Sequence, residues 1–163
     1  IGNYVRNASD SGLGNMDIPA IDWEDCKNET FLIGCIKNEE HLKWMCGYGK
    51  KPIRYNIRYG QDRDGAVTMD TEGVSKASYL VLYDFINEKD FAIYRITSHK
   101  IVTKEAMEQM HYPKPQSDYI LYELGEQVSI DRIDVAKILL HHRLDRKNEY
   151  IDGAPLFIEG WKL

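Results

Sequence analysis

Two strand-forming stretches in the middle of the chain, joined by four polar residues, constrain the fold most. Residues 77–85 (ASYLVLYDF) form the clearest strand pattern in the sequence. Residues 87–90 (NEKD) are typical of a hairpin turn, and 91–102 (FAIYRITSHKIV) predict the return strand, which is long enough to bend or bulge. The sequence therefore predicts an antiparallel hairpin in the middle of the chain.

Three further segments carry strand patterns. Residues 30–36 (TFLIGCI) are a short apolar run that is typical of a buried strand, and residues 53–59 alternate between apolar and polar side chains. Residues 118–125 (DYILYELG) predict another strand, and a tight turn at Gly125-Glu126 is expected to continue it as a hairpin. The chain thus supplies enough strands for a sheet.

Capping residues indicate helices between these strands. Asn38, Thr103 and Asp131 each precede a helical pattern, and each has a side chain that accepts hydrogen bonds from the first turn of a helix. The predicted helices cover residues 39–47, 104–112 and 132–144.

At 163 residues the chain is large enough for one domain, 1–163, with a real hydrophobic core. Residues 1–20 are rich in Gly, Ser, Asn and Asp, so we expect a loose N-terminal arm. Residues 145–163 return apolar groups, and we expect this tail to pack back on the body. The segment 65–76 fits one short strand and a loop. Strands interrupted by helices predict an α+β fold around a small, strongly curved sheet.

The overall charge and the cysteines exclude several classes of protein. A net charge of -5 excludes coating nucleic acid through bulk electrostatics. An odd number of cysteines, with no Cys-x-x-Cys, favours buried thiols in a reducing, cytoplasmic compartment over disulfides or a zinc site. No apolar run approaches the roughly 18 residues that span a bilayer, and no signal peptide is visible. This predicts no membrane partner. Phosphate-loop and dinucleotide motifs are also absent, and no cofactor is expected.

Positive charge is nevertheless concentrated in one region, between Lys43 and Arg63. This region holds six basic residues and one acid, Asp62. Alternation over 53–59 predicts two different faces for the strand inside it. We expect a buried face of Ile53, Tyr55 and Ile57 and an opposite face of Arg54, Asn56 and Arg58.

Basic and aromatic side chains interleave in this region, as in proteins that bind an unpaired or extruded base. Guanidinium forks suit phosphates and base edges, the Asn56 amide can pair with a base, and flat rings stack on bases. The alternative is that the rings belong to the core and the lysines only solubilise an edge strand. The candidate nucleic-acid-binding residues are Trp44, Tyr48, Lys50, Lys51, Arg54, Asn56, Arg58 and Tyr59.

Two other functions stay open beside a nucleic-acid-binding module. A small metal-dependent nuclease needs clustered carboxylates, and Asp70 and Glu72 are expected on one face of a strand with Asp84 across the sheet. Acids in turns and on solvated edges explain these residues better, so a binding module is favoured over an enzyme. The second alternative is a protein-interaction domain that uses its acidic surface.

From Phe31 onward the order of these patterns resembles the PUA-like superfamily, especially its EVE and ASCH type domains. The stretches that carry the resemblance are RYNIR (54–58), YLVLYDF (79–85), FAIYRI (91–96) and YPKPQSDYILYEL (112–124).

The resemblance covers about residues 31–140 and is one of pattern. It implies a small β-barrel with short flanking helices that binds DNA or RNA. It further implies a reader of a modified or flipped base, within an RNA-modification or restriction-type system, with other subunits of a larger assembly as partners.

Overall fold

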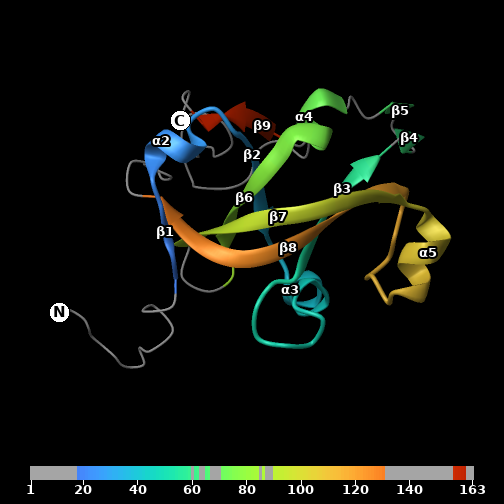
Figure 1. The fold of residues 1–163 in the computed structure, drawn as a ribbon. Coiled ribbons are helices and arrows are strands. Elements are labelled where there is room, and N and C mark those ends of the chain that lie inside the picture. Colours follow the sequence, from blue (N-terminus) through green and yellow to red (C-terminus); the bar gives the residue numbers. More distant parts are fainter. Residues whose placement is uncertain are drawn as a thin grey trace, which may run out of the picture.

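In a computed structural model, a mixed sheet of seven strands curls into a half-barrel, and four short helices of the described residues surround it (Figure 1). The expected α+β fold around a small, strongly curved sheet is confirmed. The structure describes residues 18–59, 61–62, 65–66, 71–84, 86, 90–130 and 156–160. The predicted helix over 132–144 and most of the predicted N-terminal arm lie outside these residues.

The sheet has the strand order β1-β8-β7-β6-β2-β9, and β3 pairs with the first half of β8. The pairs β2–β6 and β1–β8 are parallel, and the others are antiparallel. The strands are β1 (Ala20–Ile21), β2 (Thr30–Ile36), β3 (Arg54–Tyr59), β6 (Ala77–Asp84), β7 (Asp90–Val102), β8 (Asp118–Ile130) and β9 (Leu156–Glu159). The helices are α2 (Trp23–Cys26), α3 (Glu39–Met45), α4 (Thr71–Lys76) and α5 (Lys104–Gln109), and β4 (Gln61–Asp62) with β5 (Gly65–Ala66) forms a separate small hairpin.

The central hairpin is confirmed as β6 and β7, which pair in register from Tyr79↔Arg95 to Asp84↔Asp90. The predicted bulge is present as well, because the pairing of β7 with β8 shifts on both sides of Ile96. Bulges bend a strand and increase its twist. Figure 1 shows β7 and β8 following one long curve across the molecule, with α5 at one end.

The tight turn predicted at Gly125-Glu126 is wrong, because β8 continues through it to Ile130. A Cβ atom on Gly125 would lie 2.9 Å from Cγ2 of Thr97, on the neighbouring strand β7. Glycine at this position therefore lets two strands approach closely where the ladder is irregular, and does not reverse the chain.

Two of the predicted helix caps are confirmed. The Asn38 side chain accepts a hydrogen bond from the backbone N–H of His41 at 2.8 Å, and α3 begins at the next residue. The Thr103 hydroxyl accepts one from Ala106 at 3.1 Å, at the start of α5. Both helices are shorter than predicted, ending at Met45 and Gln109.

The segment predicted as a short strand and a loop contains a helix instead. Residues 71–76 form α4, which carries an ion pair of 2.6 Å between Lys76 and Glu72, one turn apart. A helix of six residues is too short to show a helical period in the sequence, so the pattern gave no signal for it.

The chain along β3 follows the predicted alternation only in part. Tyr55 and Ile57 are buried as expected, each 7% exposed. Ile53 is 51% exposed and not buried, because β3 begins one residue later. The backbone N–H of Ile53 donates to the carbonyl of Met45 at the end of α3, 2.9 Å away.

Tyr55 joins the two sides of the half-barrel. Its hydroxyl accepts a hydrogen bond of 3.2 Å from the backbone N–H of Cys35 in β2. That N–H lies beyond Ile33, the last residue of β2 that pairs with β9. Glycine is needed beside it, because a Cβ atom on Gly34 would lie 2.6 Å from Cζ of Tyr55. The ring thus occupies the space that a side chain would fill.

This contact predicts a pair of coupled substitutions. Gly34→Ala should lower the free energy of unfolding by about 1–3 kcal/mol, because the new methyl group overlaps the Tyr55 ring. Tyr55→Phe should lower it by roughly 1–2 kcal/mol, because the hydrogen bond between the Cys35 N–H and the Tyr55 hydroxyl is lost. Urea denaturation measures both. Gly34→Ala combined with Tyr55→Leu should cost less than the sum of the single changes Gly34→Ala and Tyr55→Leu, and simple additivity would contradict the contact.

Candidate functional site

The predicted basic face of β3 is largely covered by α3 and by residues 110–117. The Arg54 guanidinium lies 4.1 Å from the centre of the Trp44 ring, and its Nε donates to the Trp44 carbonyl at 3.0 Å. The Trp44 indole N–H donates to the carbonyl of Met110 at 2.9 Å, and Tyr112 packs edge-on against its ring. Trp44 is fully buried, so the prediction of a Trp44 ring available to stack on a base is wrong.

Asn56 is also buried, at 7% exposed, so the prediction that its amide is open to pair with a base is wrong. Its Oδ1 lies 2.9 Å from Nε2 of His41. The His41 ring in turn lies against Trp44, Tyr55 and Tyr112. Asn56 therefore bonds to a half-buried imidazole between α3 and β3.

Burial lowers the pKa of His41 below its ordinary value, and the hydrogen bond to Asn56 partly opposes this effect. Burial also raises the pKa of Tyr112. His41 and Tyr112 at the covered face of β3 thus keep their uncharged forms near pH 7, and Arg54 supplies the positive charge of that face.

Other members of the predicted set lie at the surface. Arg58 is exposed, and its Nη2 donates to Oε1 of Gln116 at 2.7 Å. Tyr59 is half-buried and packs against the core. Lys50 and Lys51 are exposed on the segment 46–53 that joins α3 to β3, which we call the basic loop.

The basic loop holds one large aromatic ring in the solvent. Tyr48 is 72% exposed. Its φ of 62° lies in the left-handed region, as does that of Gly47, because the chain turns away from α3 here. A left-handed conformation costs a residue with a side chain roughly 1–2 kcal/mol. No burial of the Tyr48 ring offsets that cost.

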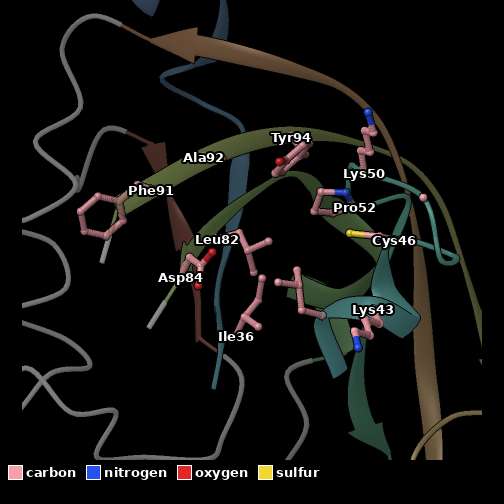
Figure 2. A pocket seen from close by; sticks show the side chains of 12 residues that line it. Ile36, Lys43, Cys46, Lys50, Pro52, Leu82, Asp84, Phe91, Ala92 and Tyr94 are labelled. Atoms are coloured by element: carbon pink, nitrogen blue, oxygen red, sulfur yellow. The ribbon is translucent and has the colours of Figure 1, made fainter. Parts of the chain in front are cut away.

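A pocket of about 400 Å³ lies between the basic loop and the β6–β7 hairpin (Figure 2). Aliphatic and aromatic side chains form most of its wall. Polar groups reach it from both sides, namely Lys43, Cys46 and Lys50 from α3 and the basic loop, and Asp84 and Tyr94 from the sheet. The remaining lining residues are Ile36, Leu42, Gly49, Pro52, Leu82, Phe91 and Ala92.

The pocket contains groups that can donate hydrogen bonds and one carboxylate. Burial raises the pKa of Tyr94 to about 12, and the nearby Cys46 and Asp84, which repel the phenolate once they are ionised, add to the effect. Burial likewise raises the pKa of the Cys46 thiol. Both groups therefore stay protonated near neutral pH. Asp84 accepts a hydrogen bond of 2.8 Å from the backbone N–H of Ile86, which fixes its carboxylate.

The pocket combines residues from two competing predictions. Lys50 belongs to the predicted nucleic-acid-binding set and Asp84 to the predicted nuclease set, and both line the same pocket, from opposite sides. Tyr94, Cys46 and Phe91 were missed. A hydrophobic pattern cannot place Tyr94 beside the basic loop, because its position depends on the pairing Leu80↔Tyr94 and on the curl of the sheet. Its phenol directly after the apolar residues 91–93 was the one available signal.

The predicted carboxylate cluster does not form. Glu72 lies on helix α4, not on a strand, just before the start of β6, and Asp84 lies at the other end of that strand. β6 separates the two carboxylates, and this strand is roughly 23 Å long. Asp70 lies outside the described residues. Within the described part of the chain, no three His, Cys, Asp or Glu side chains are placed to hold one metal ion. The pairing of Glu72 with Asp84 in a nuclease site is therefore wrong.

Comparisons with known proteins found no match among family models, curated proteins or solved structures. No helix in the part of the chain that the structure describes is long and apolar enough to cross a membrane.

The contacts of the two arginines predict different effects on stability. Arg54→Ala should lower the free energy of unfolding by about 1–2 kcal/mol, because it removes the stacking on Trp44 and the bond to its carbonyl. Arg58→Ala, at an exposed position, should change it by less than about 0.5 kcal/mol. Arg54→Lys keeps the charge and loses the planar fork, so it should lie between them. Equal effects of Arg54→Ala and Arg58→Ala in urea denaturation would contradict the covered face.

The buried imidazole predicts a pH dependence of stability. The pKa of His41 is lower in the folded protein than in the unfolded chain, so the unfolded chain takes up the proton first as pH falls. Stability should be complete above pH of about 6.5 and should decrease as pH falls below it. His41→Gln, whose amide can still donate to Asn56, should lose part of this slope below about pH 6.5. An unchanged slope in the variant would assign the effect to other groups.

Proposed function

We propose that this protein is a nucleic-acid-binding module that receives an unpaired or extruded base. The observation that carries the proposal is the pocket of about 400 Å³ whose wall includes the basic loop. The exposed Tyr48 ring and three exposed lysines, Lys43, Lys50 and Lys51, lie on or next to this loop. The pattern-level resemblance to PUA-like domains fits the same reading of modified or flipped bases.

The size and walls of the pocket support a flat organic ring. Ligand sites commonly have about 300–1,000 Å³, with apolar walls and a few placed polar groups. A base has two apolar faces and a polar edge, so it gains from apolar walls as long as its edge meets donors and acceptors. The pocket supplies both, with a Tyr hydroxyl, a thiol and a carboxylate among aliphatic side chains.

The local positive charge supports a nucleic-acid strand as the ligand rather than an uncharged molecule. The whole chain is acidic, yet three exposed lysines lie beside the pocket. Phosphates attract such a local group through short-range contacts even when the net charge is negative. In this proposal Lys43, Lys50, Lys51 and Arg58 hold the backbone, whereas Trp44, Arg54 and Asn56 keep the loop and β3 in place.

The backbone of Tyr48 gives an independent reason to assign its ring to binding. An exposed Tyr in a left-handed conformation carries a conformational cost without a packing gain. Stacking on a base contributes about 1–3 kcal/mol per ring. A ring kept in solvent beside cations is suited to that contact.

A binding titration tests the proposal. Fluorescence anisotropy with labelled single-stranded, duplex and base-modified oligonucleotides, at two salt concentrations, should show binding that weakens with salt. Lys50→Ala with Lys51→Ala should reduce the slope of log affinity against log salt. The expected reduction on a single strand is about 0.7 for each phosphate that the two lysines neutralise. Absence of binding to every oligonucleotide at low salt would overturn the proposal.

Tyr48→Asn separates binding from folding. Asparagine tolerates a left-handed backbone, so the melting temperature should stay the same or rise. Affinity for a single strand should fall about tenfold, because stacking worth about 1–3 kcal/mol is removed. Ile101→Thr, which also removes an exposed apolar side chain but near the far end of β7, should leave affinity unchanged. Equal affinities of Tyr48→Asn and the unchanged protein would remove Tyr48 from the site.

A further inference from the structure

The Tyr94 hydroxyl is the polar group in the pocket that the fold itself does not explain. Tyr94 is 7% exposed, and its ring packs in the main core cluster. Among the residues that the structure describes, none forms a hydrogen bond with its hydroxyl. A largely buried hydroxyl that lacks a protein partner destabilises a protein unless a molecule in the pocket bonds to it, and phenylalanine would pack in the same way. The hydroxyl therefore points to a ligand as its partner.

The sheet places a carboxylate across the same pocket. Leu80↔Tyr94, Leu82↔Ala92 and Asp84↔Asp90 are successive pairs of one face, so Tyr94 and Asp84 share that face. Leu82 and Ala92 lie between them and line the pocket. The pocket thus has an apolar floor with a phenol at one end and a carboxylate at the other. Figure 2 shows this order along the two strands.

The two polar groups differ in what they select. A phenol both donates and accepts hydrogen bonds, so it bonds to the edge of any base. An ionised carboxylate only accepts, and it disfavours a carbonyl oxygen placed against it. Asp84 is therefore the group that can distinguish an amino group from a carbonyl group. Lys43 and Lys50, exposed at the rim, are placed for a phosphate outside the pocket.

We infer that the pocket binds the ring of an amino-bearing base, of the cytosine or adenine kind, with Tyr94 bonding to its edge and Asp84 accepting from its exocyclic amine. Uracil and thymine, which carry a carbonyl group where cytosine carries its amine and have no exocyclic amine, are disfavoured. This inference rests on the proposed function and names the chemistry that the same site selects. The ring can belong to a nucleotide of a strand or to a free nucleotide.

The test uses oligonucleotides that differ at one position. Single-stranded thymine runs carry cytosine, adenine, uracil or an abasic site at the centre, and their affinities are measured by fluorescence anisotropy. At least one amino-bearing probe should bind about tenfold more tightly than the uracil and abasic probes. Cytidine, adenosine and uridine monophosphates form a separate arm. A monophosphate that binds as tightly as its oligonucleotide would assign the site to free nucleotides.

Three variants assign the preference to its residues. Tyr94→Phe should lower the affinity for the preferred probe about fivefold while its melting temperature stays the same or rises, because the hydroxyl has no partner among the described residues. Asp84→Asn should remove the discrimination against uracil, since an amide donates as well as accepts. Tyr79→Phe removes another buried Tyr hydroxyl, on the opposite face of β6, and should leave the preference intact.

The outcomes separate this inference from the proposed function. Equal affinity for all four probes, with no effect of Tyr94→Phe, would overturn the base preference and leave nucleic-acid binding intact. A lower melting temperature of Tyr94→Phe without a change in affinity would assign the hydroxyl to the fold and overturn the inference. Absence of binding to every probe and monophosphate would overturn both.

Discussion

The contact between the Tyr55 ring and Gly34 holds the two sides of the half-barrel together. β3 pairs only with β8 among the described strands, so its own ladder ties it to one side of the sheet. The hydrogen bond from Cys35 to the Tyr55 hydroxyl ties it to β2 on the other side. The position of β3 in turn fixes α3 and the basic loop, which precede it. The pocket between that loop and the β6–β7 hairpin therefore depends on the Tyr55 ring and on the absence of a side chain at Gly34.

The same position of β3 decides what its polar residues can do. A strand face that packs against a helix must satisfy its polar groups internally, because water does not reach them. Arg54 stacks on Trp44, and Asn56 bonds to His41. The exposed lysines and Tyr48 are therefore the groups that can contact a ligand. The positive charge concentrated between Lys43 and Arg63 thus has two roles. Part of the charge supports the fold, and part of it borders the pocket.

Local signals predicted the elements well, and pairing between distant segments was beyond them. Elements that depend on a few adjacent residues were predictable. They include the strands at 30–36 and 77–84 and the helix caps Asn38 and Thr103. Gly125 was misassigned since glycine serves a turn and a close strand approach equally well. For the site, Lys50 and Asp84 were found for unrelated reasons. Only the curl of the sheet brings them to one pocket, together with Tyr94.

The pairing of β9 with β2 has a consequence for how this chain reaches its fold. The two strands are separated by nearly the whole sequence between Ile36 and Leu156, so their ladder is among the contacts of highest sequence separation. Such contacts form late, after the entropy of closing a long loop has been overcome. Until then β2, an apolar strand, presents an unpaired edge that can recruit a strand from another molecule. During synthesis, the edge of β2 that faces β9 therefore stays without this partner until residues 156–159 have emerged.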